Sequence, residues 1–175
     1  RRDWGSDVCS SDLVRRSIKN GVGYLKNFQK VDGSWTDHAG YPGGVTSLCA
    51  LAMINAGVPV TDPAMQRALN HVRSLGKPRM VYSTSLITMF LCAAEPDKDA
   101  SLIRMNVNWL ERIQIKNGPQ RGSWAYSERN INGDNSNSQF ALLALHEAER
   151  AGVKIKESTW QLAREYWLKI GRAHV

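Results

Sequence analysis

The sequence predicts an all-α protein in which successive helical hairpins form two layers. The first observation is an alternation, in which helical segments with a charged face are followed by segments that are apolar nearly all round. A helix of the second kind must be enclosed, whereas one of the first kind can lie at the surface, so the alternation favours an outer layer around an inner one. The second observation is internal repetition, because an aromatic-Leu pair with a following Gln precedes a Gly-Ser-Trp turn twice.

The first hairpin is predicted to consist of an amphipathic helix at about 14–29 and an apolar helix at about 45–56. We expect Thr46 or Ser47 to cap the second helix, and Gly57 to end it. The apolar positions of the first helix recur at helical spacing and are Val14, Ile18, Leu25 and Phe28.

The second hairpin is predicted at about 62–75 and 82–94. Asp62 followed by Pro63 is typical of a helix start, with a cap and a proline at the first helical position. Gly76 ends the first helix of this hairpin. Its second helix is again apolar on every side, but no Gly-Ser-Trp precedes it, so the repeated motif is degenerate here.

The third hairpin is predicted at about 98–115 and 136–151, with a seventh helix starting near Ser158. The connection 116–135 is long and rich in Gly and Asn, and such loops are often functional. The chain therefore contains about three and a half hairpins.

The repeated motif consists of an aromatic-Leu pair, a Gln and a Gly-Ser-Trp turn. Its copies are Tyr24-Leu25, Gln29 and Gly33-Ser34-Trp35, then Trp109-Leu110, Gln114 and Gly122-Ser123-Trp124. This pattern resembles the QW motif of the terpenoid cyclase and protein prenyltransferase superfamily, whose repeats form an α/α toroid. The resemblance implies that the Gln ties a helix end to its neighbour while the Trp packs against it, which is a structural role. Three residues separate Gln and Gly in the first copy and seven in the second, so we expect a locally different second loop.

The two ends of the chain are related at the level of DNA. One choice of codons for residues 170–175 has a reverse complement that encodes residues 7–12. Complementary ends are typical of a translated sequencing adapter, so residues 1–13 and 170–175 are predicted to be adapter-derived and are left out of the fold prediction. Residues 14–169 are then predicted to be an incomplete arc of a squalene cyclase/prenyltransferase-like repeat domain. Localisation stays open between cytoplasmic and membrane-associated.

Composition indicates a globular chain, with 42% hydrophobic and 22% charged residues. The net charge is +7, but Lys and Arg are spread over helix faces, which favours solvated outer helices over a nucleic-acid surface. No apolar stretch approaches the roughly 18 residues of a membrane span. Cys49 and Cys92 lie in apolar helices and are expected to act as small hydrophobic residues.

Catalytic signatures of the superfamily are not found in the chain. The nearest match to an Asp-x-Asp-Asp acid motif is Asp97-Lys98-Asp99-Ala100, which lacks the third Asp and is interpreted as a helix cap. No close ligand spacing joins the candidate metal ligands, Cys49, Cys92, His38, His71 and His146. We therefore expect no metal or cofactor, and neither cyclisation nor prenyl transfer by these residues alone.

The most polar segment that leads into an apolar helix is a candidate cavity rim. Its residues are Tyr126, Asp134, Asn135, Asn137 and Gln139. The alternative, which we favour, is an N-cap with Asx turns. A second set of candidates could line a cavity for a polyisoprene chain and stabilise a carbocation by cation–π attraction: Tyr41, Tyr126, Trp35 and Trp124. Packing is the favoured role of both Trp residues.

Two functions follow from the resemblance. The complete protein would act on or bind isoprenoid-type apolar ligands along its inner helices. Alternatively, it would be a non-catalytic toroid that serves as a protein-interaction or lipid-binding module. In either case the open ends of the arc make self-association an expectation.

Overall fold

The protein is all-α, as predicted. The computed structural model describes residues 6–38, 40–77 and 79–172. Apart from two isolated β-bridges, Met80–Ser127 and Trp124–Asp134, the regular structure in these ranges is helical. The helices are α1 (Ser6–Phe28), α2 (Gly44–Asn55), α3 (Pro63–Ser74), α4 (Val81–Ala94), α5 (Ala100–Ile113), α6 (Asn135–Arg150) and α7 (Glu157–Arg172).

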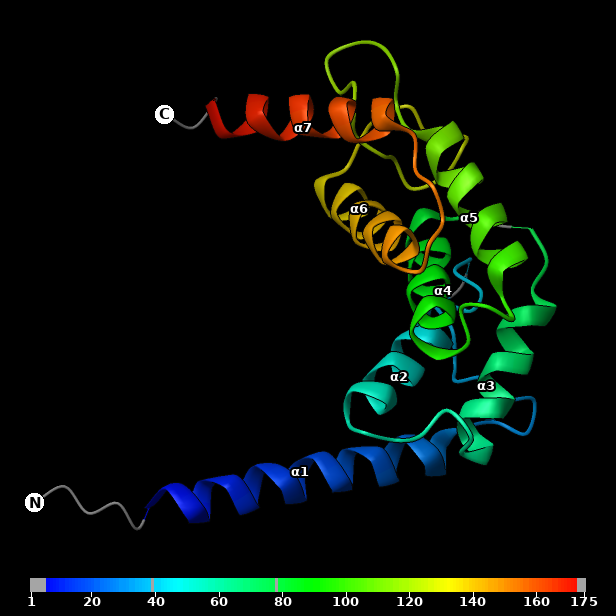
Figure 1. Ribbon diagram of the computed structural model, residues 1–175, viewed down its shortest axis with the longest axis vertical. Coiled ribbons are helices and arrows are strands. Elements are labelled where there is room, and N and C mark those ends of the chain that lie inside the picture. The colour runs from blue at the N-terminus through cyan, green and yellow to red at the C-terminus, as the bar shows by residue number, and fades with distance from the viewer. Residues whose placement is uncertain (1–5, 39, 78, 173–175) are drawn as a thin grey trace, which may run out of the picture.

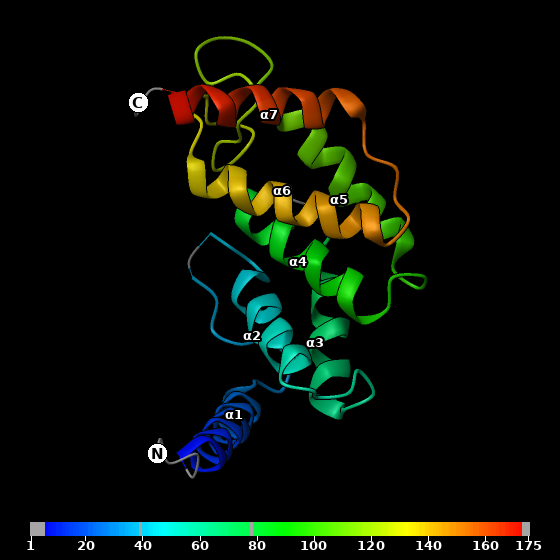
Figure 2. The same cartoon turned by 60° about the vertical axis from the view of Figure 1, so that its left-hand side comes forward.

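The helices form an arc with two layers (Figure 1). The inner layer consists of α2, α4 and α6, and α4 packs against both of the others. Helices α3 and α5 lie on the convex side, and α1 and α7 lie at the two ends of the arc. The N-terminal ends of the inner helices lie along one edge of the molecule, on the left of Figure 2. Loops that precede the inner helices therefore meet at this edge.

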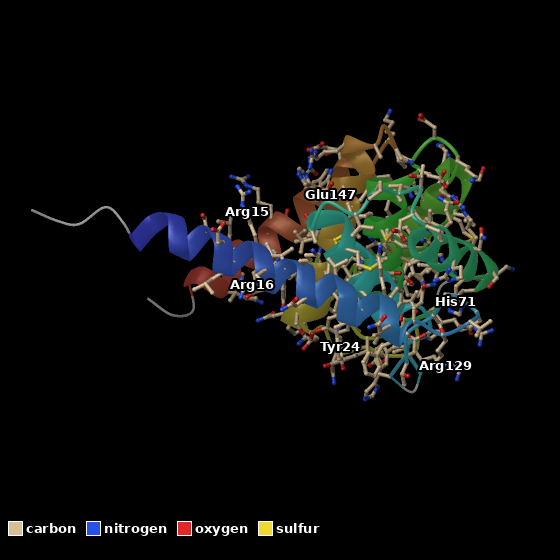
Figure 3. All side chains as sticks on the ribbon, turned by 90° about the horizontal axis from the view of Figure 1, so that it is seen from below. Arg15, Arg16, Tyr24, His71, Arg129 and Glu147 are labelled. Atoms are coloured by element: carbon tan, nitrogen blue, oxygen red, sulfur yellow. The ribbon has the colours of Figure 1, made fainter. Side chains whose placement is uncertain are left out.

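Helix α1 begins earlier than predicted. It starts at Ser6 and runs through residue 13, the boundary that the sequence analysis placed at the end of the adapter-derived segment. No proline interrupts residues 6–28, so a helix that forms at 14–28 can propagate toward the N-terminus. Residues 11–20 are all exposed, and Figure 3 shows this part of α1, with Arg15 and Arg16, extending from the body of the protein. Residues 1–5 and 173–175 lie outside the described residues.

The prediction that Thr46 or Ser47 caps α2 is wrong. The N-cap residue is Gly43, with φ of 75°. Asp37 supplies the missing acceptor, because its carboxylate accepts hydrogen bonds from the backbone N–H of Gly43 (2.7 Å) and Val45 (3.1 Å). The turn before α2 brings this carboxylate back to the helix start, where its negative charge complements the helix dipole.

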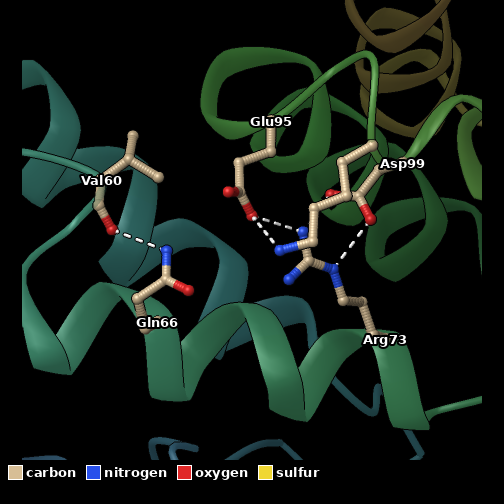
Figure 4. Close-up of polar contacts among 6 residues, drawn as sticks. Val60, Gln66, Arg73, Glu95 and Asp99 are labelled. Carbon is tan, nitrogen blue, oxygen red and sulfur yellow. Dashed lines mark hydrogen bonds and ion pairs between the residues drawn. The ribbon is translucent and has the colours of Figure 1, made fainter.

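Asp99 is the N-cap residue of α5, but its carboxylate makes no capping bond, in contrast to the prediction. Instead it accepts hydrogen bonds from Arg73 of α3, from Nε at 2.8 Å and Nη2 at 2.7 Å (Figure 4). Arg73 Nη2 also donates to Glu95 at 2.6 Å, and this bond holds the pKa of Glu95 below its usual value. Asp99 is 3% exposed. An unpaired carboxylate at this depth would cost more free energy than an uncapped helix end, so Asp99 pairs with Arg73.

Trp35 joins the two helices of the first hairpin. Its indole Nε1 donates to the carbonyl of Leu25 (2.9 Å) in α1, and its backbone N–H donates to Thr46 Oγ1 (3.1 Å) in α2. Gln29 joins this hairpin to the next, because its Nε2 donates to the carbonyl of Ala64 (2.8 Å) in the first turn of α3. The bonds of Trp35 satisfy the Leu25 carbonyl at the end of α1 and a Thr46 hydroxyl that would otherwise be buried alone.

Trp124 and Gln114 repeat these bonds in the third hairpin. The indole Nε1 of Trp124 donates to the carbonyl of Leu110 (2.8 Å), and its backbone N–H donates to Ser138 Oγ (2.8 Å). Gln114 Nε2 donates to the carbonyl of Thr159 (3.1 Å) in the first turn of α7. The two motifs therefore place an outer helix, an inner helix and the following outer helix in the same arrangement.

The longer second loop does not alter this arrangement. The N–H of Lys30 donates to the carbonyl of Ser34 (2.8 Å), and the N–H of Ile115 donates to that of Ser123 (2.9 Å). The same backbone pair thus closes both turns, and the extra residues of the second loop lie between its ends, within 116–121. The unequal Gln-to-Gly spacing is therefore compatible with one motif geometry.

The glycines of the two motifs lie against backbone of the following outer helix. A Cβ added at Gly33 would lie 2.2 Å from the carbonyl oxygen of Arg67, and one added at Gly122 would lie 2.0 Å from that of Leu162. Both glycines also have positive φ, 86° and 97°. Glycine is needed here because the loop, the outer helix and the next outer helix pack with no room for a side chain.

We expect Gly122→Ala to destabilise the protein more than Gly118→Ala does. Both residues have positive φ, which costs an alanine about 1–2 kcal/mol, but nothing lies within 4 Å of a Cβ at Gly118. At Gly122 the clash with a helix carbonyl adds at least about 2 kcal/mol, because backbone must move. Urea unfolding of the two variants measures the difference, and equal losses would show that the close approach is unimportant.

Candidate ligand-binding face

Asp134, the carboxylate of the predicted rim, caps α6. Its Oδ1 accepts hydrogen bonds from the backbone N–H (2.8 Å) and the Nδ2 (2.9 Å) of Asn137, and from the hydroxyl of Ser136 (2.5 Å). Burial opposes ionisation of Asp134, but the bonds from Ser136 and Asn137 outweigh burial and lower its pKa below the usual value. The site therefore holds this carboxylate in its ionised form, which suits a cap and not a proton donor.

The other predicted rim residues point to different partners. Asn135 Oδ1 accepts a hydrogen bond from the hydroxyl of Tyr166 in α7 (2.6 Å), and Asn137 is fully buried beside Asp134. Gln139 is exposed and lines a groove between α6 and α7. The polar segment thus belongs mainly to the start of α6. Tyr126 lies outside this helix, and the charge of Asp134 raises its pKa.

An aromatic cluster lies at the edge where the inner helices begin. Tyr82, in the first turn of α4, contacts Phe140 of α6 with ring centroids 5.0 Å apart and Tyr126 at 6.2 Å. Tyr41, from the loop before α2, contacts Tyr82 at 6.5 Å. We define Tyr41, Tyr82, Tyr126 and Phe140 as the aromatic rim. Sequence reasoning identified Tyr41 and Tyr126 but missed Tyr82, since only the packing of α2, α4 and α6 brings its ring between theirs.

The inner helices at the ends of the arc leave apolar side chains exposed. Leu48 of α2 is 54% exposed and Leu143 of α6 is 44% exposed. In the central inner helix α4, the Leu at the position of Leu48, which is Leu86, is only 7% exposed, and Phe90 is fully buried. Helix α4 has an inner helix on both sides, and α2 and α6 each have one on a single side. Equivalent positions are therefore buried in α4 and exposed in the helices at the ends.

The two tryptophans of the motifs do not line the concave face. Trp35 is 5% exposed and Trp124 is fully buried, and both are held by the interlayer hydrogen bonds described above. Their indole faces are therefore packed between layers and are not presented to a ligand.

Grooves lie at both ends of the arc. Helix α1 and the turn after α2 enclose one, of about 490 Å³, whose apolar lining includes Ile18 and Val22. Helices α6 and α7 enclose the other, of about 460 Å³, whose lining includes Leu143 and Trp160. In the first motif the aromatic residue Tyr24 is 60% exposed, whereas its counterpart Trp109 is 6% exposed (Figure 3 labels Tyr24). The ends of the arc thus expose positions that are covered in its middle.

The predicted metal-ligand candidates do not come together. Among the described residues, no group of three or more His, Cys, Asp or Glu side chains could hold a metal ion. Cys49 and Cys92 are free thiols, and burial is the main cause that raises the pKa of Cys92 to about 12. At neutral pH this thiol is protonated and is a poor nucleophile. Of the described helices, none is both long enough and apolar enough to cross a membrane.

Comparison with protein-family models, with curated proteins and with solved structures found no match to this chain. The resemblance of the two Gln and Gly-Ser-Trp motifs to the QW motif therefore stays a prediction.

We expect Asp134→Ala to destabilise the protein by about 0.5–2 kcal/mol at pH 7, the usual effect of losing an N-cap. The folded-state pKa of Asp134 is lowered, so its stabilisation is present above the unfolded value near 3.8 and is lost as pH falls through the folded value. The difference between wild type and variant should therefore shrink in acid. Chemical denaturation from pH 7 to pH 3 measures it, and a difference that is independent of pH would contradict the ionised cap.

Proposed function

We propose that this chain is an arc of a squalene cyclase/prenyltransferase-like α/α toroid whose concave face binds an elongated apolar ligand of the isoprenoid type. The observation that carries the proposal is the apolar surface that α2 and α6 leave exposed beside the aromatic rim. Leu48 is 54% exposed and Leu143 is 44% exposed. Apolar side chains exposed to this extent on an inner layer favour a ligand, a partner or further hairpins as their cover.

The shared geometry of the two motifs supports the toroid part of the proposal. Trp35 and Trp124 bond the same helix positions, and Gln29 and Gln114 bond the first turn of the following outer helix. Each motif connects its hairpin to the following outer helix by the same contacts, and repetition of one packing step produces curvature. An arc curved in this way collects the apolar faces of its inner helices on one concave side.

Electrostatics favours binding over catalysis for the described residues. Cyclisation needs a strong acid that is protonated at neutral pH, whereas Asp134 has a lowered pKa and three hydrogen-bond donors. The aromatic rim supplies ring faces that attract an apolar chain or a cation without any ionisation.

Photocrosslinking with a diazirine-bearing farnesol tests the proposed face. We expect labelled peptides from α2, α4 and α6, and we expect Leu48→Gln with Leu143→Gln to lower labelling at least threefold, because polar amides weaken contact with an apolar chain. The matched control is Val31→Gln, which changes an apolar side chain that is 98% exposed in a loop. Labels confined to α3 and α5, or unchanged by the double variant, would reject the concave face as the binding site.

Self-association through the ends of the arc is a second candidate function. The grooves beside α1 and between α6 and α7 are of similar volume but have different linings, so one copy would contact another head to tail. A contact of this kind continues until a ring closes or a chain of copies forms. The exposed apolar side chains of both ends are the observation that favours it.

Sedimentation velocity tests this candidate. We expect the sedimentation coefficient to rise with protein concentration, and Ile18→Glu with Leu143→Glu to abolish the rise, because a buried unpaired carboxylate opposes the contact. Ile131→Glu, at a loop residue that is 85% exposed and outside both grooves, is the control. A wild type that stays monomeric at all concentrations would exclude association through these grooves.

A further inference from the structure

The middle hairpin contains a cavity where the other hairpins hold a tryptophan. The cavity has a volume of about 270 Å³ and lies between α3, α4 and α5, apart from the concave face. Its linings include Val72 and Gly76 from the end of α3, Thr84 from α4, and Leu102 and Met105 from α5. The repeat register shows why the space is empty.

The inner helices align through a shared tripeptide, Thr46-Ser47-Leu48 in α2 and Thr84-Ser85-Leu86 in α4. In the first hairpin Thr46 Oγ1 accepts a hydrogen bond from the backbone N–H of Trp35. The segment between α3 and α4 contains no tryptophan. The hydroxyl of Thr84 has no hydrogen-bond partner although the residue is only 1% exposed. Thr84 is thus the acceptor of the repeated motif without its donor.

The outer helices align through their buried positions, which are Met65, Leu69 and Val72 in α3 and Ile103, Val107 and Leu110 in α5. Val72 then corresponds to Leu110, whose carbonyl accepts the indole N–H of Trp124. Gly76 corresponds to Gln114, so no amide side chain ties α3 to α5 at this point. Arg73, through Asp99, makes that connection instead.

The far wall of the cavity follows the same register. Leu102 and Met105 of α5 stand where Ala64 and Arg67 stand in α3. Those two residues contact the first motif, because Ala64 accepts a hydrogen bond from Gln29 and Arg67 lies against Gly33. The residues that line this cavity therefore correspond to those that contact the Gln and Trp side chains in the other two hairpins. The middle hairpin has these contacting positions but lacks the Gln and the Trp.

The lining combines an apolar body with a few polar groups. Ile87, Leu91 and Leu75 supply apolar walls. Ser83 Oγ, beside Thr84 in α4, is a second buried hydroxyl without a partner. The buried residue Asn106 of α5 also lines the cavity. Lys77 and Arg79 line the mouth and are exposed. Buried hydroxyls without partners beside apolar walls are typical of a site that a ligand satisfies.

The volume restricts the ligand to a small molecule. Pockets for drug-sized ligands run from roughly 300 to 1,000 Å³, whereas benzene enters an apolar cavity of about 150 Å³. A cavity of about 270 Å³ lies between these values. A bicyclic aromatic ring is of the right size, and it is the group that the other two hairpins place at this position.

We propose that the cavity between α3, α4 and α5 binds a small aromatic acid, with an indole-sized ring in the place of the missing tryptophan side chain. The ring N–H donates to Thr84 Oγ1, whose counterpart Thr46 Oγ1 accepts the backbone N–H of Trp35. The carboxylate lies at the mouth, beside Lys77 and Arg79. This site is separate from the concave face of the proposed function.

Methionine-methyl NMR with indole-3-acetate as the probe tests the site. Met80 and Met105 line the cavity, whereas Met53, Met65 and Met89 do not. We expect saturable shifts of the Met80 and Met105 methyl signals alone. Indole, which lacks the carboxylate, should bind more weakly than indole-3-acetate because it gains nothing from the two cations.

Three sets of variants separate the contributions. Thr84→Val, which keeps the shape but removes the hydroxyl, should weaken binding about threefold to tenfold, the usual range for one hydrogen bond. Lys77→Glu with Arg79→Glu should remove the preference for indole-3-acetate over indole, whereas Arg104→Glu, an exposed change on α5 outside the cavity, should not. Met105→Trp should fill the cavity, abolish the Met80 shift and raise the thermal midpoint.

Each outcome decides the proposal. Shifts at Met80 and Met105 that Thr84→Val weakens and Met105→Trp abolishes support it. No shift, or shifts at all five methionines, overturns it. A shift of Met89 without Met80 or Met105 also overturns it, and would place the probe on the inner layer, where the farnesol crosslinking experiment gives an independent result.

Discussion

The hydrogen bonds that Trp35 and Trp124 make with both layers determine the geometry of this protein. Each indole N–H donates to a backbone carbonyl in the last turn of an outer helix, that of Leu25 in α1 and that of Leu110 in α5. Each tryptophan backbone N–H bonds a buried hydroxyl of the following inner helix. The side chain that fills the space between layers therefore also sets their distance and angle. Gln29 and Gln114 extend the constraint to the following outer helix, and the close approach of Gly33 and Gly122 depends on it.

The middle hairpin stays in register although it lacks this motif. Arg73 of α3 bonds the buried carboxylate of Asp99 before α5. The equivalent ion pair in the first hairpin is Lys26 with Asp62, and in the third its sign is reversed, with Glu111 bonded to Lys156. Each hairpin therefore has an ionic contact with the start of the next outer helix. Because these contacts do not fill the space between layers, the middle hairpin keeps its register and still has a cavity.

Position in the arc decides how much of each inner helix is covered. Leu48 and Leu86 are leucines at equivalent positions of two repeats, yet Leu48 is 54% exposed and Leu86 is 7% exposed. The sequence of either helix alone gives no reason for this difference. It arises because α4 has an inner neighbour on both sides and α2 has one. The apolar faces proposed as ligand-binding and self-association surfaces are thus a consequence of where the arc ends.

Sequence by itself determined the all-α class, the order of the hairpins and most helix bounds, because apolar periodicity and Gly, Pro and Asp signals act locally. It also identified Gln29, Trp35, Gln114 and Trp124, since a repeated pattern is visible without structure. The sequence did not predict that Asp37 caps α2 or that Asp99 forms an ion pair. Local patterns assign a cap to the nearest polar side chain, whereas folding brings these carboxylates to partners that are farther away in the sequence. The placement of Tyr82 in the aromatic rim, and the cavity at Thr84, were decided only by the tertiary structure, because both depend on which helices become neighbours in space.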